Sequence, residues 1–377
     1  MSSSGRPVDE RDRAFIRRTL DLALAGWGQT APNPLVGAVV VRDGVVVGEG
    51  AHLRHGDLHA EPVALAHAGE RARGATVYVS LEPCTHLGKT PPCTDALIAA
   101  GVARVVIATA DPNPRAAGGA GRLRDAGIEV MVGVEEAAAR ELNAPFFFAH
   151  HSARPWITLK LAVSIDGALT DARRSSAWLT GPESRAEVHR MRANSDAIAV
   201  GAGTVLADDP LLTVRGALQP RVAPVRVVFD ARLETPPDSR ILQTAAGPGT
   251  VMPAPRTILL ATRGASDADA ARRAVLERAG ADIIIADSLA AGLTALKERG
   301  IQSLLVEGGA AVAGALLEAA VVDRLVIFQA PIVLGQGAIN AFSRAPASQV
   351  TTTARLPVVE RRTLGDDLMT VYALTDP

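Results

Sequence analysis

The chain has 377 residues, which at about 150 residues per domain predicts two domains or slightly more, each large enough for its own core. Its 39 basic and 40 acidic side chains leave a formal net charge of -1, and 3% of the residues are aromatic, which argues against a nucleic-acid-binding surface. No apolar run approaches the roughly 20 residues that span a bilayer, and the polar N-terminus lacks the apolar core of a signal peptide. Two cysteines cannot form the disulfide framework of a secreted protein. We therefore expect a cytoplasmic protein that binds no membrane.

Helices and strands are predicted to alternate along the first 145 residues. Apolar residues at helical spacing predict an amphipathic helix over residues 13–26, and two β-branched runs, 36–41 and 45–47, flank Asp43-Gly44 as in a β-hairpin. Further along, the pattern predicts helices at residues 59–68 and 94–100 and strands at residues 76–80 and 105–108. This alternation indicates a three-layer α/β domain.

A second alternation follows, and we place the boundary near residue 150, which gives domains 1–150 and 151–377. The predicted strands cover residues 156–162, 196–200, 225–230, 256–261, 282–286 and 303–306, and the predicted helices cover residues 182–193, 268–279 and 311–319. Residues 233–255 are rich in Pro and Gly and are predicted to form a loop. The most apolar stretch, residues 310–328, is interrupted by three charged residues and does not resemble a membrane span.

The first domain carries a candidate zinc site. His59-Ala-Glu61 opens a predicted helix, and Cys84 and Cys93 follow a predicted strand. One imidazole and two thiolates suit zinc, and three protein ligands leave the fourth tetrahedral position open, as in catalytic sites. Zinc lowers the pKa of a bound water toward about 7, and Glu61 is suited to pass a proton to a departing amine. His-x-Glu followed by Pro-Cys and a second Cys is the signature of zinc deaminases.

The same residues are compatible with four alternatives to this assignment. His52, His55 and His86 are alternative ligands, and a helix-capping histidine beside two buried thiols would also arise by chance. A zinc that serves only structure would need a fourth protein ligand, for which His86 is the close candidate. A nucleic-acid deaminase would share the motif, but it predicts a basic surface and stacking aromatic residues.

Further motifs occur in a fixed order along the chain: Pro32-Asn-Pro-Leu-Val-Gly37, Thr90-Pro-Pro-Cys93, Asp111-Pro-Asn-Pro114, Leu159-Lys-Leu-Ala-Val-Ser-Ile-Asp-Gly167, Val200-Gly-Ala-Gly-Thr204, Asp208-Asp-Pro210, Leu212-Thr-Val-Arg215, Val306-Glu-Gly-Gly309 and Ala330-Pro-Ile-Val-Leu-Gly335. Together with eight residues between the two cysteines, this series resembles the bifunctional riboflavin-biosynthesis deaminase/reductase family from about residue 10 to the C-terminus.

The resemblance implies a cytidine-deaminase-like α/β domain followed by a dihydrofolate-reductase-like α/β domain. It implies one zinc ion per chain and NADPH as cofactors, and a small pyrimidine nucleotide as substrate. The first domain would deaminate 2,5-diamino-6-(5-phosphoribosylamino)pyrimidin-4(3H)-one. The second would reduce the ribosyl chain of 5-amino-6-(5-phosphoribosylamino)uracil to ribityl. The sequence is compatible with a homo-oligomer and does not decide the oligomeric state.

The resemblance also implies roles for individual residues. In the first domain it implies zinc ligands at His59, Cys84 and Cys93, a proton donor at Glu61, and substrate contacts at Asn33, His52 and Lys89. In the second domain it implies substrate contacts at Ser176, Arg192, Leu212, Arg215 and Glu307. It implies cofactor contacts at Ala162, Trp178, Thr204, Asp208, Gly309, Ala310, Ala311, Val312, Ala313, Gly314 and Ala315.

Some of these positions, each taken alone, would also suit an ordinary structural role. Lys89, Arg192 and Arg215 would each suit a surface charge, and Gly308-Gly309 after a strand would suit a tight turn. Neither glycine-rich stretch continues to the third glycine of the dinucleotide-binding fingerprint. An arginine nevertheless suits a phosphate because its planar fork offers paired, charged hydrogen bonds.

Overall fold

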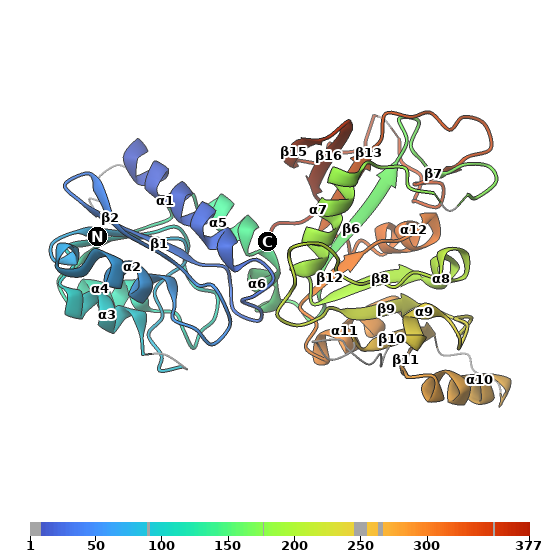
Figure 1. The fold of residues 1–377 in the computed structure, drawn as a ribbon, viewed down its shortest axis with the longest axis horizontal. Coiled ribbons are helices and arrows are strands. Elements are labelled where there is room, and N and C mark those ends of the chain that lie inside the picture. The colour runs from blue at the N-terminus through green and yellow to red at the C-terminus, as the bar shows by residue number, and fades with distance from the viewer. Residues whose placement is uncertain (1–8, 89–90, 176, 245–254, 263–266, 350) are drawn as a thin grey trace. The chain divides into compact units, whose positions relative to one another are not determined.

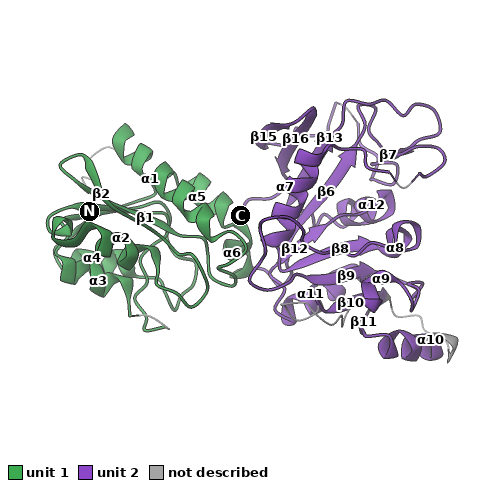
Figure 2. Cartoon of the chain, viewed as in Figure 1, with its two compact units in different colours: residues 1–151, 377 green, residues 152–376 purple. Residues whose placement is uncertain are grey.

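The computed structural model describes residues 9–88, 91–175, 177–244, 255–262, 267–349 and 351–377 (Figure 1). The chain divides into two compact units, unit 1 with residues 1–151 and 377, and unit 2 with residues 152–376 (Figure 2). Two of the predicted site residues, Lys89 and Ser176, lie outside the described residues. Within these ranges, no helix is long and apolar enough to cross a membrane.

Unit 1 is built on a five-stranded sheet with the order β2-β1-β3-β4-β5. Strand β1 pairs antiparallel with β2 and with β3, whereas β3, β4 and β5 run parallel. The hairpin between β1 and β2 is confirmed: Asp43 and Gly44 have φ of 52° and 78°, as a two-residue hairpin turn requires. The strands are β1 (Gly37–Arg42), β2 (Val45–Ala51), β3 (Thr76–Val79), β4 (Arg104–Ile107) and β5 (Glu129–Val132).

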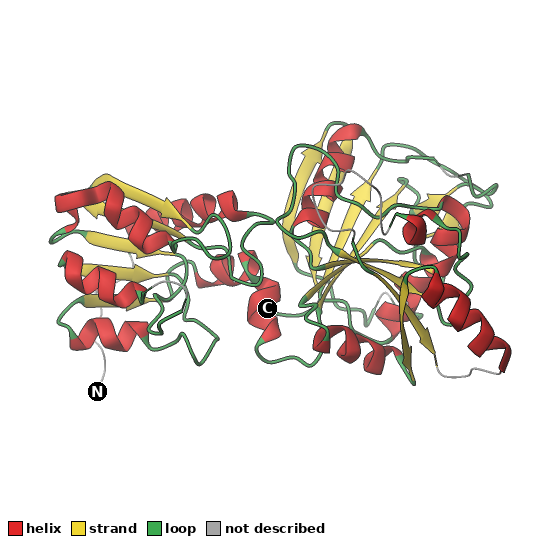
Figure 3. Cartoon of the chain, turned by 60° about the horizontal axis from the view of Figure 1, so that its bottom comes forward, coloured by secondary structure: helices red, strands yellow, loops and turns green. Residues whose placement is uncertain are grey.

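Helices cover both faces of this sheet (Figure 3), because successive side chains of a strand point to opposite faces. Ala38 and Val40 of β1 share a core with one set of helices, and Val39 and Val41 share a core with the other. The first set is α2 (Ala60–Ala68), α3 (Cys93–Ala100) and α4 (Gly119–Asp125), and the second is α1 (Glu10–Ala23) and α5 (Glu136–Leu142). The predicted three-layer α/β architecture is therefore confirmed, and α6 (Ala144–Ala149) follows it.

The first helix differs from its prediction at both ends. It begins earlier, because the Asp9 side chain accepts a hydrogen bond from the Arg11 N–H and caps the helix. It ends at Ala23, and a 3-10 turn covers Leu24–Gly26. A Cβ atom at Gly26 would lie 2.4 Å from the His52 carbonyl oxygen, so this turn approaches the backbone of a predicted site residue closely.

Unit 2 is built on a nine-stranded sheet with the order β11-β10-β9-β8-β12-β6-β13-β16-β15. The strands from β11 to β13 run parallel, and β16 and β15 extend the sheet as an antiparallel pair. The nine strands are β6 (Trp156–Val163), β8 (Ala197–Gly201), β9 (Val225–Phe229), β10 (Thr257–Thr262), β11 (Ala281–Ala286), β12 (Ser303–Val306), β13 (Arg324–Gln329), β15 (Val358–Leu364) and β16 (Asp367–Ala373). A separate two-stranded sheet joins β7 (Ala168–Thr170) to β14 (Ile339–Asn340).

The helices of unit 2 also lie on two faces. One face is covered by α11 (Leu289–Glu298) and α12 (Ala310–Glu318), whose buried residues join Leu159 and Leu161 of β6 in one core. The opposite face is covered by α7 (Pro182–Ala193), α8 (Ala202–Asp208), α9 (Arg240–Gln243) and α10 (Asp267–Arg278). Lys160 and Ala162, which alternate with the two leucines, therefore point toward the α7 side of the sheet.

The predicted loop over residues 233–255 is partly wrong, because α9 lies inside it. Ile241 and Leu242 are buried against the core that Leu259 of β10 joins, and this packing stabilises a helical turn that composition did not indicate. Residues 245–254 lie outside the described residues.

Candidate active sites

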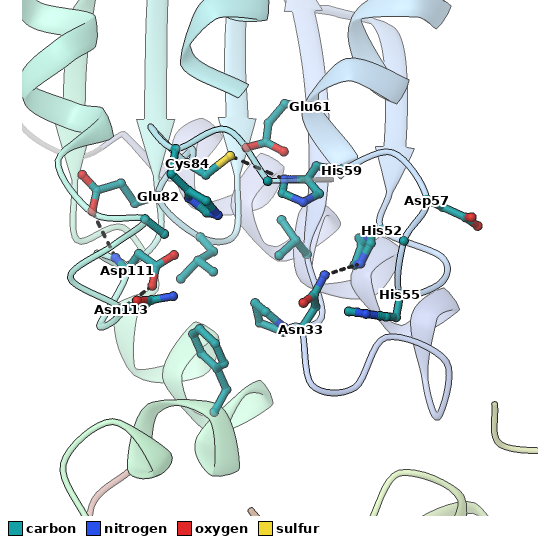
Figure 4. Close-up of a pocket in the computed structure, with 18 residues that line it drawn as sticks. Asn33, His52, His55, Asp57, His59, Glu61, Glu82, Cys84, Asp111 and Asn113 are labelled. Atoms are coloured by element: carbon teal, nitrogen blue, oxygen red, sulfur yellow. Dashed lines mark hydrogen bonds between the residues drawn. The ribbon is translucent and has the colours of Figure 1, made fainter. Parts of the chain in front are cut away.

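The ends of two helices bring the predicted zinc ligands together in unit 1. His59 is the N-cap residue of α2, Cys93 is the first residue of α3, and Cys84 lies in the loop that follows β3. Since α2 and α3 pack side by side on one face of the sheet, their N-terminal ends lie close together. His59 and Cys84 line one cavity (Figure 4). Ligands that lie 34 positions apart in the sequence, His59 and Cys93, thereby become neighbours.

The three ligand atoms have the spacing of a metal site. His59 Nδ1 lies 3.2 Å from Cys93 Sγ and 3.6 Å from Cys84 Sγ, and all three atoms lie within 4.8 Å of one another. The hydrogen bond with the Cys93 thiol lowers the pKa of Cys84, and the same bond together with burial raises the pKa of Cys93. Two sulfur atoms and an imidazole nitrogen in one buried cluster are the donor set that zinc prefers, so the residues fit the metal.

Glu61 lies in the first turn of α2, beside this cluster but outside it. Its side chain is 3% exposed, and its Oε2 atom has no hydrogen-bond partner among the described residues. Burial raises the pKa of this carboxyl group above its ordinary value. A buried carboxyl oxygen without a protein partner, next to a metal site, is suited to exchange a proton with a bound substrate or water.

A cavity of about 230 Å³ opens onto the cluster, and Asn33 and His52 lie in its wall (Figure 4). His52 Nδ1 lies 3.0 Å from the Leu58 carbonyl oxygen, which can only accept, so this nitrogen carries the proton. Burial lowers the pKa of His52, so the ring is neutral and its Nε2 accepts from the Asn33 amide at 3.2 Å. The pair is therefore oriented, with the Asn33 carbonyl oxygen left for a ligand.

Three further polar residues line this cavity to which the sequence analysis gave no role in the site: Glu82, Asp111 and Asn113. The Glu82 carboxylate accepts hydrogen bonds from the backbone N–H groups of Asp111 and Ala120, and so ties the Asp111 loop to the segment that carries Cys84. Burial raises the pKa of Asp111 to about 6. The available signals were the Glu before Pro-Cys and the Asp-Pro-Asn-Pro loop, but their convergence depends on tertiary structure.

The alternative zinc ligands also lie near the cavity. His52, His55 and His86 all line it, yet the cluster of candidate ligands in the described part of the chain consists of His59, Cys84 and Cys93. A structural zinc site with His86 as its fourth ligand is therefore not the arrangement that these residues form.

Of the predicted substrate residues of unit 2 that the structure describes, Arg192 and Glu307 meet beyond the carboxyl end of strand β12. Glu307 directly follows β12, and both of its carboxylate oxygens accept from Arg192 of α7, at 2.5 Å from Nε and 3.0 Å from Nη2. The third guanidinium nitrogen of Arg192, Nη1, donates to the Thr213 carbonyl oxygen at 2.8 Å. Burial would raise the pKa of Glu307, but the Arg192 guanidinium more than offsets this, so the pKa is lowered and the pair is ionised.

Leu212 and Arg215 belong to the segment that Arg192 holds. Leu212 is buried and has φ of 47°, an uncommon conformation for a leucine. The Arg215 side chain is exposed. The two arginines thus differ in their surroundings: Arg192 is 8% exposed and bound to protein groups, whereas the Arg215 side chain is open to solvent.

Lys160 is a further polar residue at this site that was not predicted as a contact. It lies on β6 with its side chain on the α7 face, and its amine lies 5.6 Å from the centre of the Phe328 ring. Desolvation by burial lowers the pKa of Lys160, and the Glu307 carboxylate partly offsets this effect. The motif Leu159-Lys-Leu contained the signal, since a lysine between two core leucines must face the other side of the sheet.

The predicted cofactor residues lie on two helices that begin at the same edge of the sheet. Thr204 and Asp208 are on α8, which follows β8, and residues 309–315 open α12, which follows the neighbouring parallel strand β12. The two turns are close, because a Cβ atom at Gly201 would lie 2.7 Å from Val312 Cγ2. Gly309 is the N-cap residue of α12, no side chain caps this helix, and its Cα faces open space. These features fit the phosphates of a dinucleotide.

The remaining two cofactor predictions lie apart from these turns in the sequence. Ala162 is near the end of β6, where it pairs with Phe328 of β13. Trp178 is 72% exposed, and the Arg185 guanidinium lies 5.5 Å from the centre of its ring. An exposed indole ring is available to contact a bound cofactor.

Unit 1 has the site of a zinc-dependent deaminase: a buried His/Cys/Cys cluster with an adjacent carboxyl group. Unit 2 has the features of a nucleotide-dependent reductase: a mostly parallel α/β sheet with two uncapped glycine-rich turns. The chain thus joins a deaminase to a reductase. The family model for the cytidine and deoxycytidylate deaminase zinc-binding region matches residues 9–109, and the model for the RibD C-terminal domain matches residues 155–370. The chain belongs to the RibD family of riboflavin-biosynthesis proteins. It is a bifunctional deaminase and reductase, and its cofactors are zinc and NADPH.

Relatives match nearly the whole chain. The riboflavin biosynthesis protein RibD of Aquifex aeolicus is 42% identical over 368 residues, which are 97% of this chain and 99% of the relative. That of Escherichia coli is 39% identical over 383 residues, covering 95% of this chain and 98% of the relative. The solved structure of Acinetobacter baumannii RibD superimposes with a TM-score of 0.81 at 34% identity, covering 97% of this chain and 99% of that one. The family and the fold class expected from the motifs are therefore confirmed.

Proposed function

We propose that unit 1 deaminates 2,5-diamino-6-(5-phosphoribosylamino)pyrimidin-4(3H)-one, and that residues 1–150 form this catalytic domain. The observation that carries the proposal is the His59, Cys84 and Cys93 cluster with the unpartnered Oε2 of Glu61 beside it. The substrate is supported by a solved Thermotoga maritima protein, 34% identical with a TM-score of 0.79, which is named a diaminohydroxyphosphoribosylaminopyrimidine deaminase/5-amino-6-(5-phosphoribosylamino)uracil reductase.

The residues of the cavity divide the work of this hydrolysis. His59, Cys84 and Cys93 would hold zinc, which supplies Lewis-acid activation of water when bound. Glu61 takes a proton from the water and returns it to the amine, so that the C–N bond breaks, ammonia leaves and a carbonyl group remains. The oriented Asn33–His52 pair holds the pyrimidine or its sugar. We place Lys89 at the phosphate, because its charge suits that group.

For unit 2, we propose reduction of 5-amino-6-(5-phosphoribosylamino)uracil by NADPH, with residues 151–377 as the reductase domain. Bound NADPH would supply the hydride that reduces C1 of the sugar, the bond between C1 and the ring oxygen would open, and that oxygen would take up a proton, which leaves a ribityl chain. Ser176, Leu212, Arg215, Arg192 and Glu307 hold this nucleotide, with Arg215 as the phosphate contact. The Lys160 amine is buried on the same side of the sheet, and we propose that it holds a proton near the sugar.

NADPH is assigned to the two glycine-rich turns. Residues 309–315, the turn and the start of α12, would hold its phosphates, because the N–H groups of the first helical turn have no side-chain cap. Thr204 and Asp208 would contact the cofactor from α8. Ala162 and Trp178 complete the proposed cofactor site. We also infer that the protein works in the cytoplasm, because Cys84 and Cys93 must stay reduced to bind zinc.

Ammonia release and NADPH oxidation on the full chain test the proposal. The purified chain should release one ammonia per diaminopyrimidine nucleotide, and NADPH should then be oxidised only after deamination. Failure to release ammonia from this nucleotide, with release from a cytosine in single-stranded nucleic acid instead, would contradict the assignment and favour a nucleic-acid deaminase.

Arg215→Ala should raise the KM of the reductase for the deaminated nucleotide by about 10- to 30-fold. A hydrogen bond to a charged group contributes roughly 1.5–3 kcal/mol to binding. We expect a loss near the lower end of that range, because the Arg215 side chain is exposed to water. Phosphate binding is largely uniform between ground and transition states, so kcat should change little. Steady-state kinetics in both substrates provide the measurement. A weakened NADPH interaction with an unchanged nucleotide KM would move Arg215 to the cofactor site.

Each half of the chain should keep its own reaction when expressed alone. The two units have separate hydrophobic cores, so fragments 1–150 and 151–377 should fold independently. The first should release ammonia, and the second should oxidise NADPH with the deaminated nucleotide. Two soluble fragments that lack both activities would show that the reactions require the intact chain.

A further inference from the structure

The segment that carries Arg215 is fastened to helix α7 through its backbone. The Arg215 N–H donates to His189 Nδ1 at 3.1 Å, and the Thr213 carbonyl oxygen accepts from Arg192 Nη1 at 2.8 Å. His189 and Arg192 are three positions apart in α7, so their side chains project from the same face of the helix. Two hydrogen bonds from one helix face therefore hold three consecutive residues of the segment.

Helix α7 is itself firmly placed. At its N-terminal end the Asp367 carboxylate accepts from the Gly181 N–H at 2.8 Å and from the Ser184 hydroxyl at 2.6 Å. Further along, Val188 packs in a core with Val326 and Phe328 of β13. A side chain on this helix can therefore fix the position of a neighbouring loop.

The held segment has a conformation that needs such support. Leu212 has φ of 47° and Asp209 has φ of 39°, both in the left-handed region that residues other than glycine rarely adopt. Burial of the Leu212 side chain anchors the segment at one end. At the other end, the Arg215 side chain is exposed, and its direction depends on the backbone that His189 holds.

His189 must be neutral for this hydrogen bond, because a backbone N–H only donates and Nδ1 has to accept. Burial lowers the pKa of His189, the positive charges of Arg192 and Arg215 lower it further, and the Glu307 carboxylate and a hydrogen bond with the Thr213 backbone only partly offset these effects. The imidazole is thus kept in the form that accepts.

We propose that His189 is a positioning residue of the reductase, whose Nδ1 holds the Arg215 backbone and thereby sets the Arg215 guanidinium for the nucleotide phosphate. This inference rests on the proposed function, because it takes Arg215 as the phosphate contact. As a positioning residue, His189 acts through the Arg215 backbone that it holds. Its removal is expected to weaken nucleotide binding without slowing the chemical step.

A pair of isosteric variants isolates the hydrogen bond. Leucine and asparagine have the same branching at Cγ, and the Oδ1 atom of asparagine occupies the position of histidine Nδ1. His189→Asn should therefore keep a KM for the deaminated nucleotide within about two-fold of the wild type, as expected where an acceptor is retained. His189→Leu removes the acceptor and should raise this KM about 3- to 10-fold, the range of one neutral hydrogen bond. In both variants, kcat and the KM for NADPH should stay near wild type.

Arg215→Ala, measured in parallel, separates the role of His189 from that of the phosphate contact. A raised nucleotide KM in Arg215→Ala with no change in His189→Leu would overturn the role of His189 and leave the phosphate contact in place. Equal losses in His189→Asn and His189→Leu would also overturn it, because the acceptor would then be irrelevant. No effect of Arg215→Ala would refute the phosphate contact and the inference together. If His189→Leu fails to bind NADPH and is therefore misfolded, His189→Ala also lacks the acceptor and provides the same test.

Discussion

Replacing Cys93 by serine is expected to remove zinc from the protein and abolish ammonia release, while NADPH oxidation on the deaminated nucleotide continues. Cys93 is fully buried, and its Sγ lies 3.2 Å from His59 Nδ1, at the centre of the candidate ligand cluster. A serine hydroxyl is a poor substitute for a thiolate as a zinc ligand. The loss of one of three ligands should exceed the roughly 10- to 100-fold loss of metal affinity that follows removal of a supporting group around a metal site. Cys84→Ser should behave in the same way.

Metal analysis of the purified variants, alongside both enzyme assays, provides the measurement. His86→Gln is the matched control, because His86 lines the same cavity but lies outside the cluster. Its zinc content should remain about one ion per chain. Full zinc occupancy in both cysteine variants would contradict the ligand assignment, and loss of zinc in His86→Gln would instead support a site with a fourth protein ligand.

The continued reductase activity in these variants has a structural basis. The zinc cluster belongs to unit 1, whereas the Arg192–Glu307 pair and the glycine-rich turns belong to unit 2, each with its own core. A change in the core of one unit is therefore not expected to disrupt the core of the other. The cysteine variants therefore distinguish a lost metal from a misfolded chain within one preparation.

The sequence predicted the local parts of this structure well. The Asp43-Gly44 hairpin, helix α7 and strand β12 depend on short-range patterns, and the structure places them where the patterns do. The edge strand β15 was not predicted, because most of its residues are exposed and no alternating apolar face indicates it. Helix α9 was also not predicted, because it is a single turn within a Pro- and Gly-rich stretch. It is stabilised by the burial of two apolar residues in the core of the unit, which the local sequence does not indicate.

The sites divide in a similar way. His59, Glu61, Cys84 and Cys93 were recognisable because zinc chemistry demands particular residue types at short spacing, and the fold brings these residues together. Glu82 and Asp111 were not assigned to the site, because their contact joins a carboxylate to a backbone N–H, and no pairing of residue types indicates such a bond. The bond between Arg192 and Glu307 spans 115 positions and depends on strand order, which residue patterns alone do not specify. His189 gave no sequence signal at all, because its partner is a backbone N–H.

Glu61→Gln is expected to leave zinc in place and to lower deamination by at least roughly 100-fold, the lower limit for a lost general acid/base. Glutamine keeps the size of the side chain, and the carboxylate is not among the candidate ligands, so the metal site should persist. The amide cannot take a proton from water and return it to the leaving amine. A 100-fold loss corresponds to about 2.7 kcal/mol of transition-state stabilisation.

The structure also predicts how this loss should be distributed between kcat and KM. Glu61 Oε2 has no hydrogen-bond partner among the described residues, so glutamine breaks no protein contact at that atom, and the KM for the nucleotide should change little. Asp57→Asn is a suitable control, because Asp57 is an exposed acidic residue in the wall of the same cavity, and its kcat should stay within about two-fold of the wild type. Zinc analysis and ammonia release on the three proteins provide the measurement. Deamination near the wild-type rate in a zinc-loaded Glu61→Gln protein would assign the proton transfer to another group, and the buried Asp111 carboxyl, with its pKa raised to about 6, would be the next residue to replace.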